Sequence, residues 1–404
     1  MTGELRGRLR RWFWRPPRPH GEVIADRTVS ALELFYDLVY VTVIAQAAHH
    51  LAGHVSVGGV AEFAVVFALI WVAWTNGSLY LEVHGREDGR TRTLVFGQMS
   101  ILALLAVFTE HAADSSGRSF GLVYASFLAV QTVLWYTVWR QDRRDHPEFL
   151  SLTRAYTTGM AIAVGVILAS GFLPAGPRLV VWAGFAVAWV VGMALVARSG
   201  RVAFRGGITP TDSLVERLGL FTIIVLGEVV FGVVDGLVSA ERDVKTVATG
   251  MLALWLGFGL WWIYFDLVGR RLPRDDGGAL SNWLLSHLPL TGSIAAAGAG
   301  MVSLIGHAHD ARTPVGTAWL LAGAVAVALL TLVLTEQALV DAERLLVVFG
   351  PLSPALAGGA AAALLVGWAR PAPWLLVLAL VAVLAALWFF AVSRFLRAGA
   401  WGEP

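Results

Sequence analysis

Two acidic residues in the first long apolar stretch, Glu33 and Asp37, have the chemistry to bind a cation or exchange a proton. They are four residues apart, so on a helix over residues 30–48 their side chains would share one face. An ionised side chain facing lipid costs on the order of a few kcal/mol or more. The spacing therefore predicts a helix whose acidic face contacts protein or water.

Two further polar residues are expected deeper in the membrane. Glu228 follows Ser213, where a later apolar stretch begins, by fifteen residues, or about 22 Å of helix. Gln46 reaches a similar depth in the first stretch. A buried carboxylate without a basic neighbour tends to take up or share a proton. Glu228 is therefore a candidate transport group, or alternatively a neutral side chain that joins two helices through a hydrogen bond.

The beginnings of these two stretches look alike. Ser30 with Glu33, and Ser213 with Glu216, have the spacing of a capping box, in which both side chains bond to free backbone N–H groups of the first turn. The sequence therefore predicts that both helices are capped by serine.

The acids near these helix starts have two interpretations. They are caps and ion pairs at the membrane edge, neutralised by Arg27, Arg217 or Arg270. Alternatively, Asp37, Glu216 and Arg217 belong to a gate or an ion-coordinating site. Asp37 favours the second interpretation because it lies two turns into its helix.

Histidines gather at the expected outer ends of three stretches, where they could sense pH or bind a metal ion. They are His49, His50, His54, His111, His307 and His309. Their spacing matches no strong motif such as His-Glu-x-x-His, so no metal site is expected. His287, which precedes Pro289, is expected to pack at the inner mouth and is also a transport or gating candidate.

Several chemistries are excluded or disfavoured. The chain contains no Cys, which excludes thiol catalysis and thiolate metal sites. It also lacks a phosphate loop, a dinucleotide fingerprint and a nucleophile elbow, which argues against an ATP-driven pump or a hydrolase. No cofactor is expected, and no catalytic residue is assigned.

Membrane helices must position these residues. The 404 residues are 57% hydrophobic and 14% charged, and the mean hydropathy is +0.68, outside the range of soluble domains. Twelve continuous apolar stretches of about 20 residues are each long enough to cross the bilayer as a helix, whereas a β-barrel needs short alternating segments. The predicted fold class is an all-α, polytopic helical membrane protein. The helices are expected to start near Ser30, Gly58, Leu94, Phe120, Ser151, Leu179, Ser213, Thr246, Leu280, Gly316, Val347 and Trp374.

Basic residues predict the orientation. With the N-terminus in the cytoplasm, the inner segments hold 24 of the 30 Lys and Arg residues, as the positive-inside rule requires. Both termini are therefore expected in the cytoplasm, and the net charge of +2 reflects topology rather than nucleic-acid binding. Residues 1–28 form a basic and aromatic segment that lies on the anionic membrane surface or only fixes the topology.

An internal repeat is also predicted. At an offset of 184 residues Tyr80 aligns with Tyr264, and at an offset of 196 residues His111 aligns with His307. The chain is expected to comprise two parallel six-helix repeats, residues 29–200 and 201–404. Such repeats naturally place a transport path between the halves, although duplication without transport is the other interpretation. The glycines Gly292, Gly298 and Gly300 predict close packing of the ninth helix against a neighbour.

Three motifs resemble those of a known family. They are Glu-Leu-Phe-Tyr-Asp-Leu-Val-Tyr-Val at 33–41, Glu-Arg-Leu-Gly-Leu-Phe-Thr-Ile-Ile-Val-Leu-Gly-Glu at 216–228 and His-Leu-Pro-Leu at 287–290. Because these motifs occur in this order along the chain, the chain resembles the bacterial low temperature requirement A proteins. The resemblance implies a multi-pass bacterial membrane protein linked by name to growth in the cold, and it transfers no catalytic role.

A second likeness concerns mechanism. Phe35-Tyr36-Asp37 is similar to the Phe-Ser-Asp motif of the lysosomal and prokaryotic potassium channels that share this helix count. Tyr36 replaces the Ser, and Gly219-Leu220 stands where the Asp would recur in the second half. The resemblance therefore does not extend to a symmetric channel gate.

The expected function is movement of a small solute or ion across the bacterial cytoplasmic membrane, with Asp37, Gln46, Glu216 and Glu228 lining or gating the path. An intramembrane or lipid-modifying enzyme, with Glu33, Asp37 and the outer histidines as acid and base, is an alternative. A structural or sensory membrane protein is another. Membrane lipids are the expected partners, an oligomer is compatible with the sequence, and nucleic acid is not expected.

Overall fold

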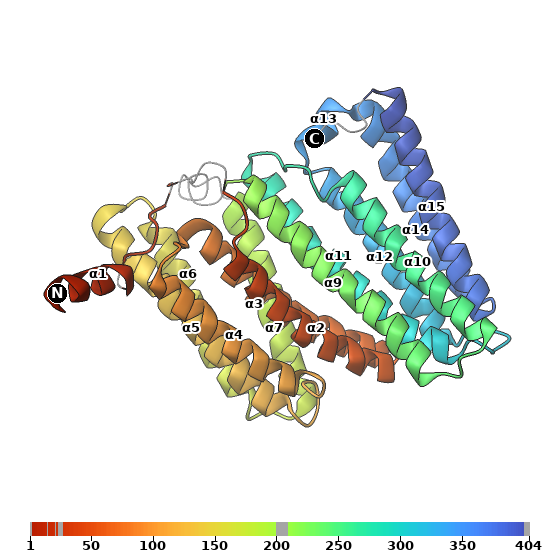
Figure 1. Cartoon of the computed structure of the whole chain (residues 1–404), viewed down its shortest axis with the longest axis horizontal. Coiled ribbons are helices and arrows are strands. Elements are labelled where there is room, and N and C mark those ends of the chain that lie inside the picture. The colour runs from red at the N-terminus through yellow and green to blue at the C-terminus, as the bar shows by residue number, and fades with distance from the viewer. Residues whose placement is uncertain (1, 14, 21, 23–26, 199–208, 400–404) are drawn as a thin grey trace. The chain divides into compact units, whose positions relative to one another are not determined.

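The structure is a computed structural model that describes residues 2–13, 15–20, 22, 27–198 and 209–399 (Figure 1). The chain folds as two units. Unit 1 comprises residues 1–46 and 68–209, and unit 2 comprises residues 47–67 and 210–404. The division into two six-helix repeats near residue 200 stays a prediction.

The all-α membrane fold is confirmed. Within the described ranges, twelve helices are long and apolar enough to cross a membrane. The predicted helix starts lie within five residues of the observed ones, because the length of a continuous apolar run largely defines such a helix. The twelve are α2 (Ala31–Gly53), α3 (Val57–His84), α4 (Gly89–Thr109), α5 (Gly117–Asp145), α6 (Leu150–Ser170), α7 (Ala175–Arg198), α9 (Asp212–Ser239), α10 (Val244–Leu267), α11 (Gly277–Gly306), α12 (Val315–Glu336), α14 (Leu346–Ala369) and α15 (Pro373–Arg397).

The described ranges also contain two short helices outside this set, which the sequence did not predict as helices. Helix α1 (Thr2–Phe13) falls within the basic N-terminal segment and exposes Leu5, Leu9 and Trp12. Helix α13 (Val340–Arg344) directly precedes α14.

One predicted cap is wrong. Helix α9 begins with Thr211 as its N-cap, whose hydroxyl accepts a hydrogen bond from the Leu214 N–H at 3.1 Å. Ser213 lies inside the first turn and is buried. Threonine caps a helix through the same hydroxyl chemistry as serine. The spacing of Ser213 and Glu216 therefore predicted a cap two residues after the observed one.

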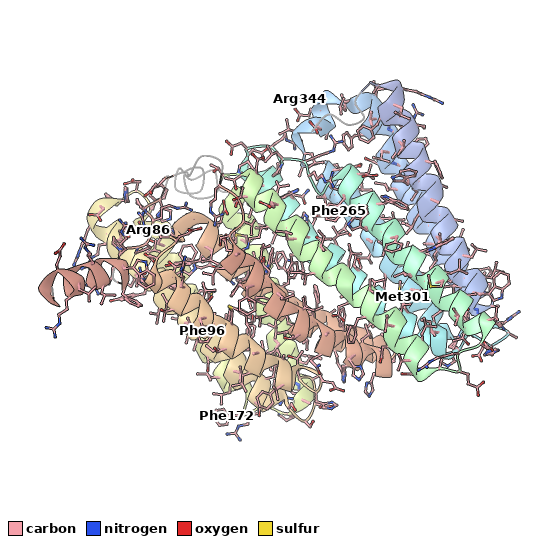
Figure 2. The ribbon with its side chains drawn as sticks, viewed as in Figure 1. Arg86, Phe96, Phe172, Phe265, Met301 and Arg344 are labelled. Atoms are coloured by element: carbon pink, nitrogen blue, oxygen red, sulfur yellow. The ribbon has the colours of Figure 1, made fainter. Side chains whose placement is uncertain are left out.

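In unit 1, α5 packs along α4 and α6, whereas α7 contacts α6 at few positions. The first part of α2, up to Gln46, and the last part of α3, from Ala68, belong to the same unit. Large apolar side chains are exposed on its surface, as contact with lipid requires. Two of them, Phe96 and Phe172, are 66% and 81% exposed (Figure 2).

In unit 2, α11 packs along α9 and α12, α12 packs along α14, and α10 packs along α15. The predicted close approach of the ninth membrane helix is confirmed. A Cβ added at Gly298 would lie 2.9 Å from the backbone oxygen of Glu228, and one at Gly300 would lie 2.9 Å from Leu321. The absence of side chains at these positions lets α11 contact its neighbours through backbone atoms.

Candidate functional site

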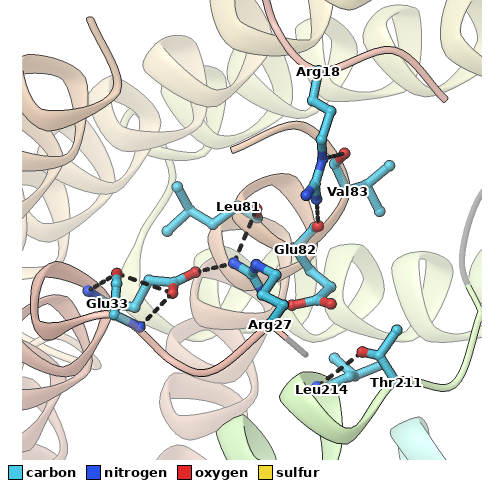
Figure 3. Close-up of polar contacts among 9 residues, drawn as sticks. Arg18, Arg27, Glu33, Leu81, Glu82, Val83, Thr211 and Leu214 are labelled. Carbon is cyan, nitrogen blue, oxygen red and sulfur yellow. Dashed lines mark hydrogen bonds and ion pairs between the residues drawn. The ribbon is translucent and has the colours of Figure 1, made fainter. Parts of the chain in front are cut away.

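The predicted capping box of α2 is confirmed, and it is joined to an arginine. Glu33 accepts hydrogen bonds from the Ser30 backbone N–H at 3.0 Å and from the Ser30 hydroxyl at 3.1 Å. Arg27 donates to Glu33 at 2.6 Å and also forms an ion pair with Glu82 of α3 (Figure 3). Arg27 therefore neutralises two buried acids, as expected if the acids near the helix starts are caps and ion pairs. Glu33 also caps the start of α2.

Asp37 lies one turn further along α2 and is fully buried. Its carboxylate accepts a hydrogen bond from the Trp74 indole N–H of α3 at 2.8 Å. A charge-assisted bond of this type is stronger than a neutral one and fixes the carboxylate at one point. Asp37 is thus held inside unit 1 and faces protein, as the sequence predicted.

Tyrosine and glutamine side chains surround this position. The hydroxyls of Tyr36 and Tyr40 lie 3.1 Å apart. At Gly77 of α3, an added Cβ would collide with the Tyr36 hydroxyl and would lie 3.1 Å from the Gln131 side-chain nitrogen of α5. Glycine at this position therefore lets three helices bring polar groups together. We call Tyr36, Asp37, Tyr40, Trp74 and Gln131 the polar core of unit 1.

The sequence analysis missed Trp74 of the polar core, and it also missed Gln131. Gln131 lies at the middle of α5, is fully buried, and neither its side-chain oxygen nor its nitrogen has a hydrogen-bond partner in the described part of the chain. Leaving a buried amide unpaired costs about 1–3 kcal/mol. Such groups call for a ligand, an ion or a water molecule.

Gln46 is half-buried on α2, nine residues beyond Asp37. Nine residues correspond to about 14 Å of helix. The structure therefore separates Gln46 from the polar core, although both lie on one helix.

In unit 2, the adjacent residues Glu216 and Arg217 have different environments, since Glu216 is exposed and Arg217 is fully buried. Glu228 lies eleven residues further along α9 and is 6% exposed. Among the described residues, its carboxylate makes no hydrogen bond or ion pair, while its backbone packs against Gly298 of α11. Glu228 is therefore a buried carboxylate whose side chain joins no helix to another.

His287 of α11 has both ring nitrogens occupied. Its Nδ1 lies 2.7 Å from the Trp283 backbone oxygen, which can only accept, so Nδ1 carries the proton. Nε2 then accepts from the Tyr264 hydroxyl of α10 at 3.1 Å. This neutral ring therefore links α11 to α10, and a transport or gating role of His287 stays a prediction.

Two of the outer histidines lie within hydrogen-bond distance of an acid. His50 lies 3.2 Å from Glu62, and His309 lies 2.7 Å from Asp243. Within the described ranges, no cluster of three or more His, Asp or Glu side chains could hold a metal ion.

These features define a multi-pass helical membrane protein with carboxylates buried inside its membrane helices. The family model described as "Bacterial low temperature requirement A protein (LtrA)" matches residues 28–386, and the chain belongs to this family. It is also similar to an uncharacterized protein of Rhizobium meliloti (strain 1021), with 23% identity over 303 residues that cover 71% of this chain and 72% of the relative. The resemblance drawn from the three motifs is thereby confirmed.

Proposed function

We propose that the protein moves a small cation or a proton across the bacterial cytoplasmic membrane, with both termini in the cytoplasm, and that Asp37 binds the ion on its way. The observation that carries this proposal is the polar core of unit 1. The core contains a fully buried carboxylate, Asp37, and a buried amide, Gln131, that has no protein partner among the described residues. The Gln131 nitrogen and the hydroxyl of Tyr36, the residue before Asp37, both border Gly77.

The chemistry of the polar core suits a hard cation. Carboxylate, hydroxyl and amide oxygens are the ligands that such cations prefer, and Asp37, the two tyrosines and Gln131 supply all three types. The hydrogen bond from Trp74 orients the Asp37 carboxylate before an ion arrives, which lowers the cost of ordering the site. An ion that enters would satisfy groups that are otherwise costly to bury.

Glu228 adds a second candidate group, in unit 2. A buried carboxylate without a hydrogen-bonded partner exchanges a proton more readily than one in an ion pair. We infer that Glu228 takes part in proton exchange. Arg217 and Glu216, at the start of the same helix, would control how protons reach Glu228. A path between the two predicted repeats is the route that we propose for the ion.

The alternative of an enzyme that uses Glu33 with the outer histidines is less well supported. Glu33 and His49 lie on the same helix, sixteen residues apart, which is about 24 Å. An acid and a base that share one substrate must lie within hydrogen-bond reach of the reacting group.

The test is ion flux in proteoliposomes that contain the full chain. With K⁺, Na⁺ or H⁺ gradients, Asp37→Asn is expected to reduce the flux at least tenfold. Gln131→Leu is the sharper variant, because it replaces two unpaired polar atoms by an apolar side chain of similar size and should leave the fold as stable or more stable. Its flux is nevertheless expected to fall at least tenfold.

Glu148→Gln serves as the control, since Glu148 is an exposed acid that lies 3.4 Å from His146 and outside the polar core. The control should retain the flux of the wild type. Unchanged flux in a folded Gln131→Leu protein would overturn the proposed role of the polar core and favour a structural function for it.

A further inference from the structure

Unit 1 contains a cavity of about 540 Å³ that takes no part in the polar core. Its walls come mostly from α6 and α7, with contributions from α3 and α5. The lining is almost entirely carbon and includes Met160, Ala163, Phe185 and Met193. The cavity exists because α7 contacts α6 at few positions, whereas α6 packs along α5.

Glycines widen the cavity on both walls. Gly159 of α6 and Gly192 of α7 line it, and an added Cβ at either would meet no atom within 4 Å. Glycines in membrane helices usually bring two backbones together. Here they leave open space, so these two residues do not serve helix packing.

The dimensions fit one hydrocarbon chain. The lining residues of α6 extend from Leu152 to Val166, which is about 21 Å of helix. This length compares with about 15 Å for the acyl layer of one leaflet, half of the bilayer core. The lined length is therefore enough to hold the acyl chain of one lipid.

A polar group closes one end of this apolar space. His20 lines the cavity and is buried. Its Nδ1 lies 3.1 Å from Asp142 Oδ1 of α5, and its ring stacks on Phe149 at 4.4 Å. Because the carboxylate accepts, Nδ1 donates, and Nε2 makes no hydrogen bond within the described residues. The cavity therefore has an apolar body and a single hydrogen-bonding end.

The same end carries positive charge. The ends of α5, α6 and α7 that lie there expose more arginines than acids, and the acids are Asp145 and Glu148. Arg154 follows the lining residue Thr153, and Arg198 ends α7 shortly after the lining residue Val196. The exposed arginines are Arg140, Arg143, Arg144, Arg154 and Arg198. Such a cluster at a membrane edge attracts anionic headgroups.

We propose that this cavity binds one acyl chain of an anionic phospholipid, with the lipid headgroup at the end formed by His20, Arg154 and Arg198. The acyl chain fills the space between α6 and α7 that the two glycines leave open. The phosphate accepts hydrogen bonds from the arginines at this end. This proposal does not depend on ion transport.

The chain offers a matched pair of variants on one helix. Gly159→Phe places a ring in the cavity. Gly165→Phe changes a glycine of α6 that also has no atom within 4 Å of an added Cβ but does not line the cavity. Both full-length proteins would be purified in detergent and titrated with phosphatidylglycerol or with phosphatidylcholine of the same acyl chains, and bound lipid would be counted by native mass spectrometry.

We expect the wild type and Gly165→Phe to bind a first phosphatidylglycerol at least tenfold more tightly than phosphatidylcholine, and Gly159→Phe to lose this binding. Arg154→Gln combined with Arg198→Gln should remove the preference between the two lipids but keep one bound chain. Equal binding by Gly159→Phe and Gly165→Phe would overturn the site. Equal affinity of the wild type for both lipids would overturn the anionic headgroup.

Discussion

The indole N–H of Trp74 donates a hydrogen bond of 2.8 Å to the carboxylate of Asp37, and this bond links α3 to α2 inside unit 1. Both residues are at most 1% exposed. A buried carboxylate that loses a donor retains its desolvation cost without that compensation. The bond between Trp74 and Asp37 is therefore central to the stability of the polar core.

Replacement of Trp74 by Phe tests this bond. We expect Trp74→Phe to lower the free energy of unfolding by about 1–3 kcal/mol, because the carboxylate loses a charge-assisted hydrogen bond while most of the aromatic packing remains. The measurement is thermal or denaturant unfolding of the purified protein in detergent. Trp319→Phe is the control, since Trp319 is a membrane-helix tryptophan that is 44% exposed. An equal stability of both variants would show that the bond contributes little.

Glycines of α9 provide a second prediction, for the packing around Glu228. Gly232→Leu is expected to destabilise the protein by about 1–3 kcal/mol or more through overpacking, because its Cβ would collide with the backbone of Gly298. Gly227→Leu, five residues earlier, should be neutral or slightly stabilising, since a Cβ there meets no atom within 4 Å and glycine is a weak helix former. The melting temperatures of the two variants in detergent provide the comparison. Similar losses in both would contradict the close contact of α9 and α11.

Asp243, the N-cap of α10, gives a prediction about pH. The Thr246 backbone N–H donates to this carboxylate at 2.8 Å and, together with His309, lowers the pKa of Asp243 below its ordinary value of 3.8. Since the folded pKa is lower than the unfolded one, the stabilisation is present above the unfolded pKa and is lost as the pH falls through the folded pKa. The melting temperature should therefore fall in this acidic range.

The matched variant for this prediction is Asp243→Asn. Asparagine still caps a helix but does not titrate. The fall of the melting temperature with acid should be smaller in Asp243→Asn than in the wild type when both are scanned from neutral pH to below 3.8. Identical curves would mean that this cap contributes nothing to the acid sensitivity.

Features that depend on nearby residues could be predicted from the sequence. Long apolar runs define the membrane helices, and the Ser30–Glu33 spacing defines the cap of α2. Both features depend only on residues that lie close together in the sequence. Glu33 and Asp37 could be placed on a protein-facing stripe for the same reason. The cap of α9 shows the limit, because Thr211 and Ser213 offer the same hydroxyl two residues apart.

Features that depend on distant residues could not be predicted. Arg27 pairs with Glu82, 55 positions away, and His20 pairs with Asp142, 122 positions away. Gln131 is a lone amide in an otherwise apolar part of α5, and only the packing of Gly77 against Tyr36 reveals what surrounds it. The sequence signal that could have found Gln131 was its position at mid-helix, the same criterion that selected Gln46.

The division of α2 and α3 between the units has a consequence for how the protein is made. Residues 47–67, the end of α2 and the beginning of α3, belong to unit 2, where Phe67 lies 3.1 Å from a Cβ added at Gly292 and Val55 packs against Gly316. This helical hairpin leaves the ribosome long before Pro210 does. Residues 47–67 are therefore inserted before the rest of unit 2 has been synthesised, and a gene fragment that begins near residue 200 would encode unit 2 without this hairpin.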